Sequence, residues 1–490
     1  MKKAANIKTG LFAFIFMMLL LPALQKTISI FPVKPLEGSF DLAEKPQFSW
    51  KAWISGSYQE QYTRYLEDHI GFRNLLVRIR NQISFSLYNK TLAQNVAIGK
   101  EGVLYQDFVI EAMLGQDFIG ETALRTNAEK LKFIQDTLHK KNIELVFVIA
   151  PGKSSVLPEY IPESYDLTTN RPSNYDVWTK FLNQLDVRFL DLKSYFLAIK
   201  DTCRYPLFPR CGTHWSGYGV TLAADTMFRY LESRLGYDIP GFISDQGILT
   251  STDLRFTDDD ISKGMNLLWS PANWPVYYPE IKFQTGANLK KPNVLSIGDS
   301  FNQSFWGFYP FFGELTGPKS VFWYYDRTVA WPEEAANSSA PIASLNLQEE
   351  IESRDIILII TTEQNLSDPG FGFIARAYQL YDPAAPGFLD MEIAFEDQIW
   401  NDSTLYYRSL ERSLREGMSI DEAIKIDARM LAGEKMAKRI RRTAEYEATI
   451  RSDKNWLIEV SKKAKENGVT LDEMIRLDAE WMAKQDEHEK

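Results

Sequence analysis

The sequence has few of the residues that bind metals. Its 490 residues include only four histidines and two cysteines. It contains no His-Glu-x-x-His pattern and no cysteine pairs with zinc spacing. A Gly-rich loop of the kind that holds nucleotide phosphates is also absent. We therefore expect no metal centre, and nothing in the sequence indicates a cofactor.

The chain also has fewer basic residues than acidic residues. There are 55 Lys and Arg residues against 65 Asp and Glu residues, which gives a formal net charge of −10. An acidic chain is a poor partner for a phosphate backbone, so nucleic acid is not expected as a ligand. The hydrophobic fraction of 45% and the aromatic fraction of 13% are typical of a well-cored globular protein. A chain of this length is expected to form two or three domains.

The N-terminus carries an apolar run, Leu11–Leu24, preceded by three lysines. Its length suits the core of a cleaved signal peptide, while residues 27–33 could extend it into an uncleaved membrane anchor, which we favour. Positive charge before the run predicts that the rest of the chain lies outside the cytoplasm. We therefore expect residues 1–33 to be a signal peptide or an inner-membrane anchor, and the remainder to lie in the periplasm or cell envelope.

The two cysteines fit an oxidising compartment. Cys203 and Cys211 flank the bend Tyr205–Pro209. A short-loop disulfide between them is the natural prediction there, and the alternative is two unpaired thiols. A disulfide would stiffen the chain just before His214.

Apolar segments alternate with amphipathic helical segments between residues 34 and 390. This pattern predicts an α/β domain with a mainly parallel sheet covered on both faces. Residues 250–284 are acidic and then rich in Trp, Pro and Tyr, which indicates an insertion over the sheet. The expected strands are 144–150, 187–192, 294–297 and 355–360, and the main expected helices are 121–141, 174–185 and 217–235.

The C-terminal region, 391–490, is charged and contains an internal repeat. Gly417–Ile424 matches Gly468–Ile475, and the copies lie near 395–432 and 446–483. Each copy has a glycine that ends one helix and a capping pattern that begins the next. We therefore predict stacked helical hairpins that form a structural or docking appendage, with no catalytic residues.

One strand end has the pattern of a nucleophile site. The apolar segment Val294–Ile297 runs into Gly298-Asp299-Ser300, and α/β folds place site residues at the carboxyl ends of their strands. A free serine needs a base, and the best candidate is His214 in the sequence Gly-Thr-His-Trp. Either motif could instead be structural, as an ordinary turn or as a histidine packed on Trp215. Together they indicate acyl transfer or ester hydrolysis.

Four segments give the chain a family resemblance. Residues 96–104, 151–159, 213–216 and 297–301, with histidine before serine, resemble the SGNH-hydrolase-like proteins related to alginate O-acetyltransferases, which acetylate exopolysaccharides outside the cytoplasm. The resemblance covers roughly residues 50–382. It implies an SGNH-hydrolase-like three-layer sandwich, followed here by the all-helical repeat region.

The resemblance also implies roles for individual residues. Ser300 would be the nucleophile that carries the acetyl group, and His214 its general base. The Ser300 N–H and a second donor would bind the oxyanion, with Gly298, Thr213 and Asn365 as the candidate oxyanion or pocket residues. The substrate would be a glycan. The acetyl group would come from a membrane-bound O-acyltransferase, because acetyl-CoA is absent outside the cytoplasm.

The chain departs from the family pattern at one position. Family members usually carry Asp two residues before the histidine, and this sequence has Gly212. Asp191 and Glu363, near strand ends, and Asp299 are possible replacements; a Ser–His dyad or an inactive site are the alternatives. Three functions therefore remain open: a serine-dependent O-acetyltransferase, a carbohydrate acetylesterase with the same site, and a catalytically impaired glycan-binding or assembly protein.

Overall fold

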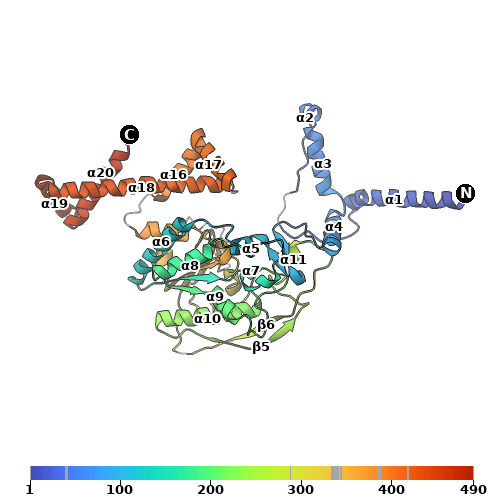
Figure 1. Cartoon of the computed structure of the whole chain (residues 1–490), viewed down its shortest axis with the longest axis horizontal. Helices are drawn as coiled ribbons and strands as arrows, with labels where there is room; N and C mark the ends of the chain where they lie inside the picture. The colour runs from blue at the N-terminus through green and yellow to red at the C-terminus, as the bar shows by residue number, and fades with distance from the viewer. Residues whose placement is uncertain are drawn as a thin grey trace. The chain divides into compact units, whose positions relative to one another are not determined.

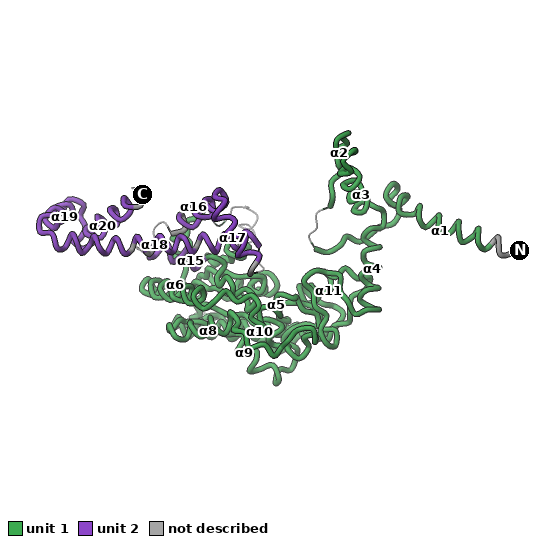
Figure 2. Tube along the Cα trace, turned by 45° about the horizontal axis from the view of Figure 1, so that its top comes forward, with its two compact units in different colours: residues 1–372 green, residues 373–490 purple. Residues whose placement is uncertain are grey.

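The structure is a computed structural model that describes residues 2–38, 42–286, 288–332, 342, 345–382, 388–416 and 419–488. The chain divides into two compact units, Met1–Gly372 and Phe373–Lys490 (Figure 2).

The first unit is built on a six-stranded sheet. All neighbouring strands are parallel except the edge pair β8–β9. Every residue of β3, β7 and β10 is buried, as expected for strands covered on both faces. The strands, in sheet order, are β4 (Phe189–Asp191), β3 (Glu144–Ala150), β10 (Ile356–Thr362), β7 (Val294–Gly298), β8 (Val321–Tyr324) and β9 (Thr328–Trp331).

Helices cover both faces of this sheet (Figure 1). Val146 and Val148 of β3 lie in one core cluster with side chains of α9 and α10. Phe147, between them, points to the other face and packs edge-on against Trp178 of α8 at 5.4 Å. The predicted fold class, an α/β sandwich with a mainly parallel sheet, is confirmed. The covering helices are α6 (Glu121–His139), α8 (Asn174–Gln184), α9 (Leu192–Ile199) and α10 (Gly217–Leu235).

Residues 250–284 lie outside the main sheet. It begins at the end of β5 (Phe242–Thr250), which pairs antiparallel with β6 (Val276–Phe283). Between these strands lies a single short helix, α11 (Asp260–Gly264). Leu104 of β2 (Leu104–Gln106), which pairs with β1 (Val96–Ile98), shares a small apolar cluster with Ile261 and Met265.

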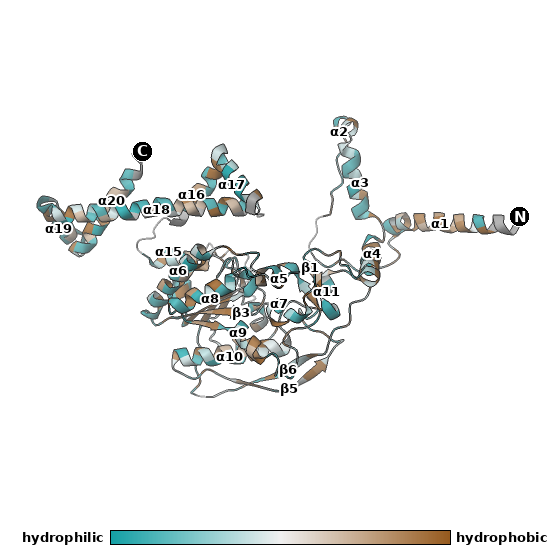
Figure 3. Ribbon diagram, viewed as in Figure 1, coloured by the Kyte–Doolittle hydropathy of each residue, from teal (hydrophilic) through white to brown (hydrophobic). Residues whose placement is uncertain are grey.

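The N-terminal helix α1 (Lys2–Ile28) contains the apolar run. Its residues Ile7–Ile28 are long and apolar enough to cross a membrane, and none of the most apolar window is buried within the protein (Figure 3). The remaining helices of the first unit include α2 (Trp50–Ser55), α3 (Ser57–His69), α4 (Arg73–Tyr88), α5 (Asp107–Met113), α7 (Lys153–Val156), α12 (Phe311–Leu315) and α14 (Leu347–Glu352).

The second unit is helical where it is described, and its two copies make equivalent contacts. Asp427 pairs with Arg412 at 2.9 Å, and Asp478 pairs with Lys463 at 2.9 Å. The long helix α18 contributes to both copies, and the predicted helix-ending Gly417 lies outside the described residues. The helices are α15 (Phe373–Tyr381), α16 (Phe388–Asn401), α17 (Ser403–Glu416), α18 (Ile420–Ser452), α19 (Lys454–Asn467) and α20 (Leu471–His488). Matching buried triads are Ile399, Ile424 and Ala428 in one copy and Ile450, Ile475 and Ala479 in the other.

Candidate active site

Ser300 lies in the turn that follows β7. The strand ends at Gly298, where a Cβ atom would lie 2.7 Å from the carbonyl oxygen of Ile360 and 2.8 Å from Asn302. Glycine is therefore needed for the turn to pass this close to β10. The turn leaves Ser300 half-buried at the carboxyl edge of the sheet, whereas the preceding residues are buried.

His214 lies in direct contact with Ser300. Its Nε2 atom is 2.9 Å from the Ser300 Oγ atom, which is the reach that a general base needs. The His214 side chain is almost wholly buried, and its ring packs against Phe301 with the centroids 4.8 Å apart. Two side chains from distant parts of the sequence thus lie in the arrangement that a nucleophile and its general base would need.

Asp260, the first residue of α11, contacts the other nitrogen of this imidazole. Its Oδ2 atom is 3.1 Å from His214 Nδ1, and its Oδ1 atom accepts a hydrogen bond of 2.9 Å from the backbone N–H of Thr213. A carboxylate in this position orients the ring and stabilises the imidazolium. No motif marks Asp260 in the sequence; the only hint is that it belongs to an acidic stretch.

Gly212 explains why the carboxylate comes from α11. A Cβ atom at Gly212 would lie 2.5 Å from the carbonyl oxygen of Thr257 and 2.7 Å from the carbonyl of Asp258. The backbone that leads to Asp260 therefore fills the space that a side chain at 212 would need. The same backbone segment therefore excludes a side chain at position 212 and brings Asp260 to the imidazole.

The three acids suggested by the sequence are engaged elsewhere, which corrects that expectation. Asp299 is fully buried and accepts hydrogen bonds from the backbone N–H groups of Phe301 and Thr362, each at 3.0 Å, and from Asn365 Nδ2 at 2.8 Å. These bonds join the turn after β7 to the end of β10. A carboxylate so occupied stabilises the turn and does not reach the imidazole.

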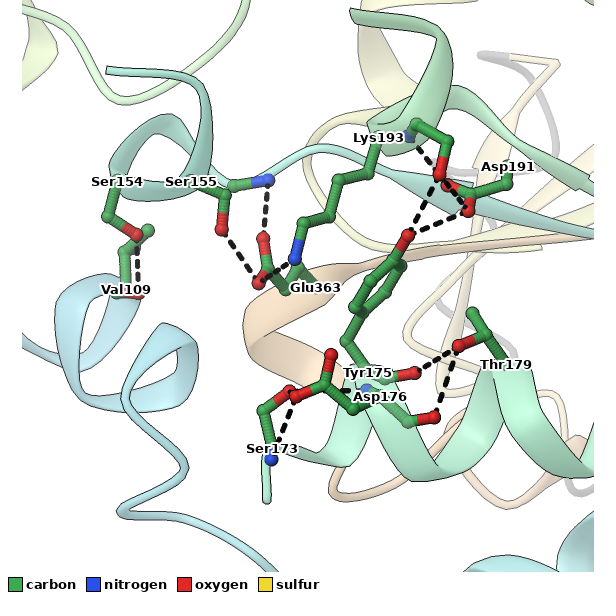
Figure 4. Close-up of polar contacts among 12 residues, drawn as sticks. Val109, Ser154, Ser155, Ser173, Tyr175, Asp176, Thr179, Asp191, Lys193 and Glu363 are labelled. Atoms are coloured by element: carbon green, nitrogen blue, oxygen red, sulfur yellow. Dashed lines mark hydrogen bonds and ion pairs between the residues drawn. The ribbon is translucent and has the colours of Figure 1, made fainter. Parts of the chain in front are cut away.

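Glu363 and Asp191 belong to a neighbouring polar cluster (Figure 4). Glu363 Oε1 is 2.7 Å from Lys193 Nζ and accepts a hydrogen bond of 2.8 Å from Ser155 Oγ. Asp191 caps α9 by accepting from the Ser194 N–H at 2.9 Å, and it also accepts from the Tyr175 hydroxyl. Both acids therefore have structural partners, and Asp260 is the carboxylate at His214.

Breaking the Glu363–Lys193 pair is expected to destabilise the fold. Both side chains are at least nine-tenths buried, so Glu363→Gln would leave an uncompensated ammonium and cost about 3–5 kcal/mol. Chemical denaturation of the purified protein would measure this loss. The matched control is Glu60→Gln, which breaks an exposed pair with Arg64 and should change stability by less than about 0.5 kcal/mol. Equal, small effects of the two substitutions would contradict a structural role for Glu363.

Tyr325 also reaches the site, and no sequence motif marked it. It lies in the tight turn after β8, where Tyr325 and Asp326 have left-handed φ values of +52° and +51°. Its hydroxyl lies near the side chains of Ser300 and Asn365. Burial, reinforced by the charge of Asp299, raises the pKa of Tyr325 to about 12. The hydroxyl therefore stays protonated near neutral pH and can donate a hydrogen bond.

The three predicted pocket residues have different surroundings. The Gly298 carbonyl accepts a bond of 2.9 Å from the Tyr325 N–H, so this glycine holds the neighbouring turn. The Thr213 hydroxyl donates to Gln106 Oε1 at 2.9 Å, while its N–H is bound to Asp260. The Asn365 side chain donates to Asp299 Oδ2 at 2.8 Å and lies near the Tyr325 hydroxyl.

The predicted disulfide is wrong in this structure, because both cysteines are free thiols. Cys211 is buried in the small cluster with Leu104 and Met265, whereas Cys203 packs on the main core beside Tyr218. Burial raises the pKa of each thiol. The two side chains pack into different clusters, and no covalent bond joins them.

Comparisons with known proteins agree with the family resemblance. Residues 96–246 match the family model of the SGNH hydrolase-like domain of acetyltransferase AlgX, a range that contains His214 and ends before Asp260 and Ser300. The probable alginate O-acetylase AlgJ of Pseudomonas syringae pv. tomato is 25% identical over 198 residues, which are 39% of this chain and 47% of that protein. The corresponding Pseudomonas putida protein is 23% identical over 201 residues, 40% of this chain and 49% of that protein. The chain thus matches about half the length of these curated relatives.

Two solved structures are also similar. The O-acetyltransferase domain of Pseudomonas putida AlgJ matches with a TM-score of 0.37 and 16% identity, covering 58% of this chain and 99% of that one. Pseudomonas aeruginosa AlgX matches with a TM-score of 0.39 and 16% identity, covering 62% of this chain and 71% of that one. The family model and the curated relatives confirm the resemblance predicted from the motifs.

Proposed function

We propose that this protein is an O-acetyltransferase that moves acetyl groups onto a polysaccharide or another glycan through an acetyl-Ser300 intermediate. The observation that carries the proposal is the hydrogen-bonded series Ser300–His214–Asp260, with distances of 2.9 Å and 3.1 Å. Nucleophile, base and orienting acid are the parts that serine acyl transfer requires. The alginate O-acetylase names of the relatives supply the reaction class.

In the first half-reaction, Ser300 takes the acetyl group from its donor. His214 Nε2 accepts the Ser300 proton as Oγ attacks the acetyl carbonyl carbon. Asp260 holds the ring in the tautomer with a proton on Nδ1 and stabilises the imidazolium that forms. When the tetrahedral intermediate collapses, the imidazolium gives its proton to the leaving oxygen, and the acetyl ester remains on Ser300.

In the second half-reaction, a sugar hydroxyl replaces the departed donor. His214 accepts the hydroxyl proton as the sugar oxygen attacks the acetyl carbon on Ser300. Collapse transfers the acetyl group to the sugar and returns the proton to Ser300 Oγ. One ester bond is broken and one is formed in each half, so no oxidant, metal or nucleotide is needed.

Charge on the carbonyl oxygen would be stabilised by two donors. The Ser300 N–H lies in the turn after β7, and the Tyr325 hydroxyl lies near the Ser300 side chain. Preorganised donors of this kind stabilise the transition state more than the ground state. Tyr325 thus takes the place of the second donor that the sequence left unspecified.

The second candidate function is a carbohydrate acetylesterase. The same residues would act, with water as the acceptor in the second half-reaction. The third possibility, a catalytically impaired glycan-binding or assembly protein, rested on Gly212, and the contact between Asp260 and His214 removes that argument.

The proposed reaction takes place outside the cytoplasm. We propose that α1 anchors the chain in the inner membrane, with the catalytic unit in the periplasm or cell envelope. The exposed apolar surface of Ile7–Ile28 supports an anchor. Acetyl groups would then be supplied by a membrane-bound O-acyltransferase, because acetyl-CoA does not reach that compartment.

The acetyltransferase and the acetylesterase can be distinguished by measuring how much of the acetyl group goes to a sugar and how much goes to water. Purified protein would be given a chromogenic acetyl ester with rising concentrations of soluble oligosaccharides, including alginate fragments. A transferase should release less acetate than chromophore as acceptor is added, and acetylated sugar should account for the difference. Equal release of acetate and chromophore with every acceptor would favour the esterase.

A further inference from the structure

A buried lysine lies directly behind the segment that carries His214. Lys153 follows β3 as the first residue of α7, and its side chain is only 1% exposed. Its Nζ atom donates to the carbonyl oxygens of Leu104 at 2.7 Å, Arg210 at 3.0 Å and Gly212 at 2.7 Å. The three N–H bonds of an ammonium group are thus matched by three acceptors.

Such a position is costly for a charged group. Burial of an ammonium is unfavourable unless hydrogen bonds and opposite charges compensate for the lost hydration. Among the residues that the structure describes, no carboxylate forms an ion pair with Lys153. A methionine would fill similar space without this cost, so a positive charge here needs a reason beyond packing.

The contacts of Lys153 suggest that reason. Two of its three acceptors, Arg210 and Gly212, lie four and two residues before His214 in the chain. Asp260 contacts the same segment as a hydrogen-bond acceptor, because its Oδ1 atom accepts from the Thr213 N–H. We propose that Lys153 is a positioning residue: its ammonium group fixes the Arg210–His214 segment and places a positive charge against the carbonyl of Gly212, two residues before His214.

The charges around Lys153 set the pH range in which it acts. Burial lowers the pKa of Lys153 to about 7, and the neighbouring Cys211, Asp260 and Asp258 oppose that shift. Burial also raises the pKa of Asp258 to about 7. Of the other titratable neighbours, Tyr105 presents its ring to the ammonium at 5.4 Å. Below about pH 7 Lys153 is therefore protonated.

This inference rests on the proposed function, but its test does not need turnover. Histidine labelled at Cε1 would be incorporated into the full chain, and the pKa of each of the four rings followed by NMR. The His214 signal would be assigned with His214→Gln. In Lys153→Gln and Lys153→Met the pKa of His214 should rise by about half a unit or more, because a nearby positive charge has been removed.

The control and the kinetic readout separate this role from a general packing role. Lys193→Gln also removes a buried lysine, but one bound to Glu363, and it should leave the pKa of His214 unchanged. Lys153→Met should also lower kcat by about tenfold or more with little change in KM, because Lys153 touches no substrate. The Gln variant keeps hydrogen-bond donors and should lose less.

An unchanged pKa of His214 in both Lys153 variants, with the other three histidine signals intact, would overturn the proposal. A raised pKa in a protein that hydrolyses or transfers no acetyl ester would uphold the role of Lys153 and count against the proposed function instead. A variant that loses the native histidine signals would leave the other variant to decide.

Discussion

Replacing Ser300 by alanine is expected to lower turnover of acetyl esters by about 10⁴-fold or more, because the site then has no atom to carry the acetyl group. Steady-state rates with a chromogenic acetyl ester would measure this loss. The His214 ring, the Asp260 carboxylate and the Tyr325 hydroxyl would remain, so a residual rate above that in water is compatible with the mechanism. Binding of the ester should change little, since only one oxygen atom is removed.

The control for this experiment is another structured serine. Ser173 caps α8 by accepting a hydrogen bond from the Asp176 N–H, and it lies outside the site. Ser173→Ala should cost about 1 kcal/mol of stability and leave the rate unchanged. A folded Ser300→Ala protein that kept its rate within tenfold of the unaltered protein would remove Ser300 as the nucleophile.

The second large effect is expected at Asp260. Asp260→Asn should lower kcat by about 10³–10⁴-fold, because an amide no longer stabilises the imidazolium and can hold the ring in the wrong tautomer. KM should change less than kcat. The neighbouring Asp259→Asn is the matched control: Asp259 pairs with the half-exposed Lys263 at 2.7 Å, and its loss should leave kcat nearly unchanged.

Restoring the acid at its usual family position should fail in this chain. Gly212→Asp places a side chain where Thr257 and Asp258 already lie, so it should not rescue Asp260→Asn and should lower stability. Recovery of kcat in the double variant to within about tenfold of the unaltered protein would contradict the view that the α11 segment and Gly212 belong to one arrangement. Equal loss of kcat in Asp259→Asn and Asp260→Asn would contradict the assignment of Asp260 itself.

The parts of the site that local patterns encode could be predicted from the sequence. The buried strand β7 is mostly apolar, and it ends at Gly298, a position where a Cβ atom would clash with the backbone of β10. His214 stands in a short motif just before a capped helix. Strand period and turn chemistry are local properties, so the fold class, Ser300 and His214 were accessible without a structure.

The remaining members depend on packing between distant segments. Asp260 meets His214 across 46 residues of sequence, and it lies in an irregular insertion with no periodic pattern. Tyr325 lies in a turn in which it and Asp326 adopt left-handed φ values. Neither residue is glycine, so the sequence does not mark this turn. The disulfide prediction failed for a related reason: spacing suggested a link, but each cysteine packs into a different cluster.

The most direct test is the mass of the enzyme during turnover. Purified protein would be mixed with an activated acetyl ester, quenched in acid within milliseconds to seconds, digested and analysed by mass spectrometry. The account predicts one added acetyl group on the peptide that contains Ser300, its loss when a glycan acceptor is added, and its absence in Ser300→Ala. Full turnover with no acetyl group on that peptide, or with the acetyl group on another residue, would contradict it.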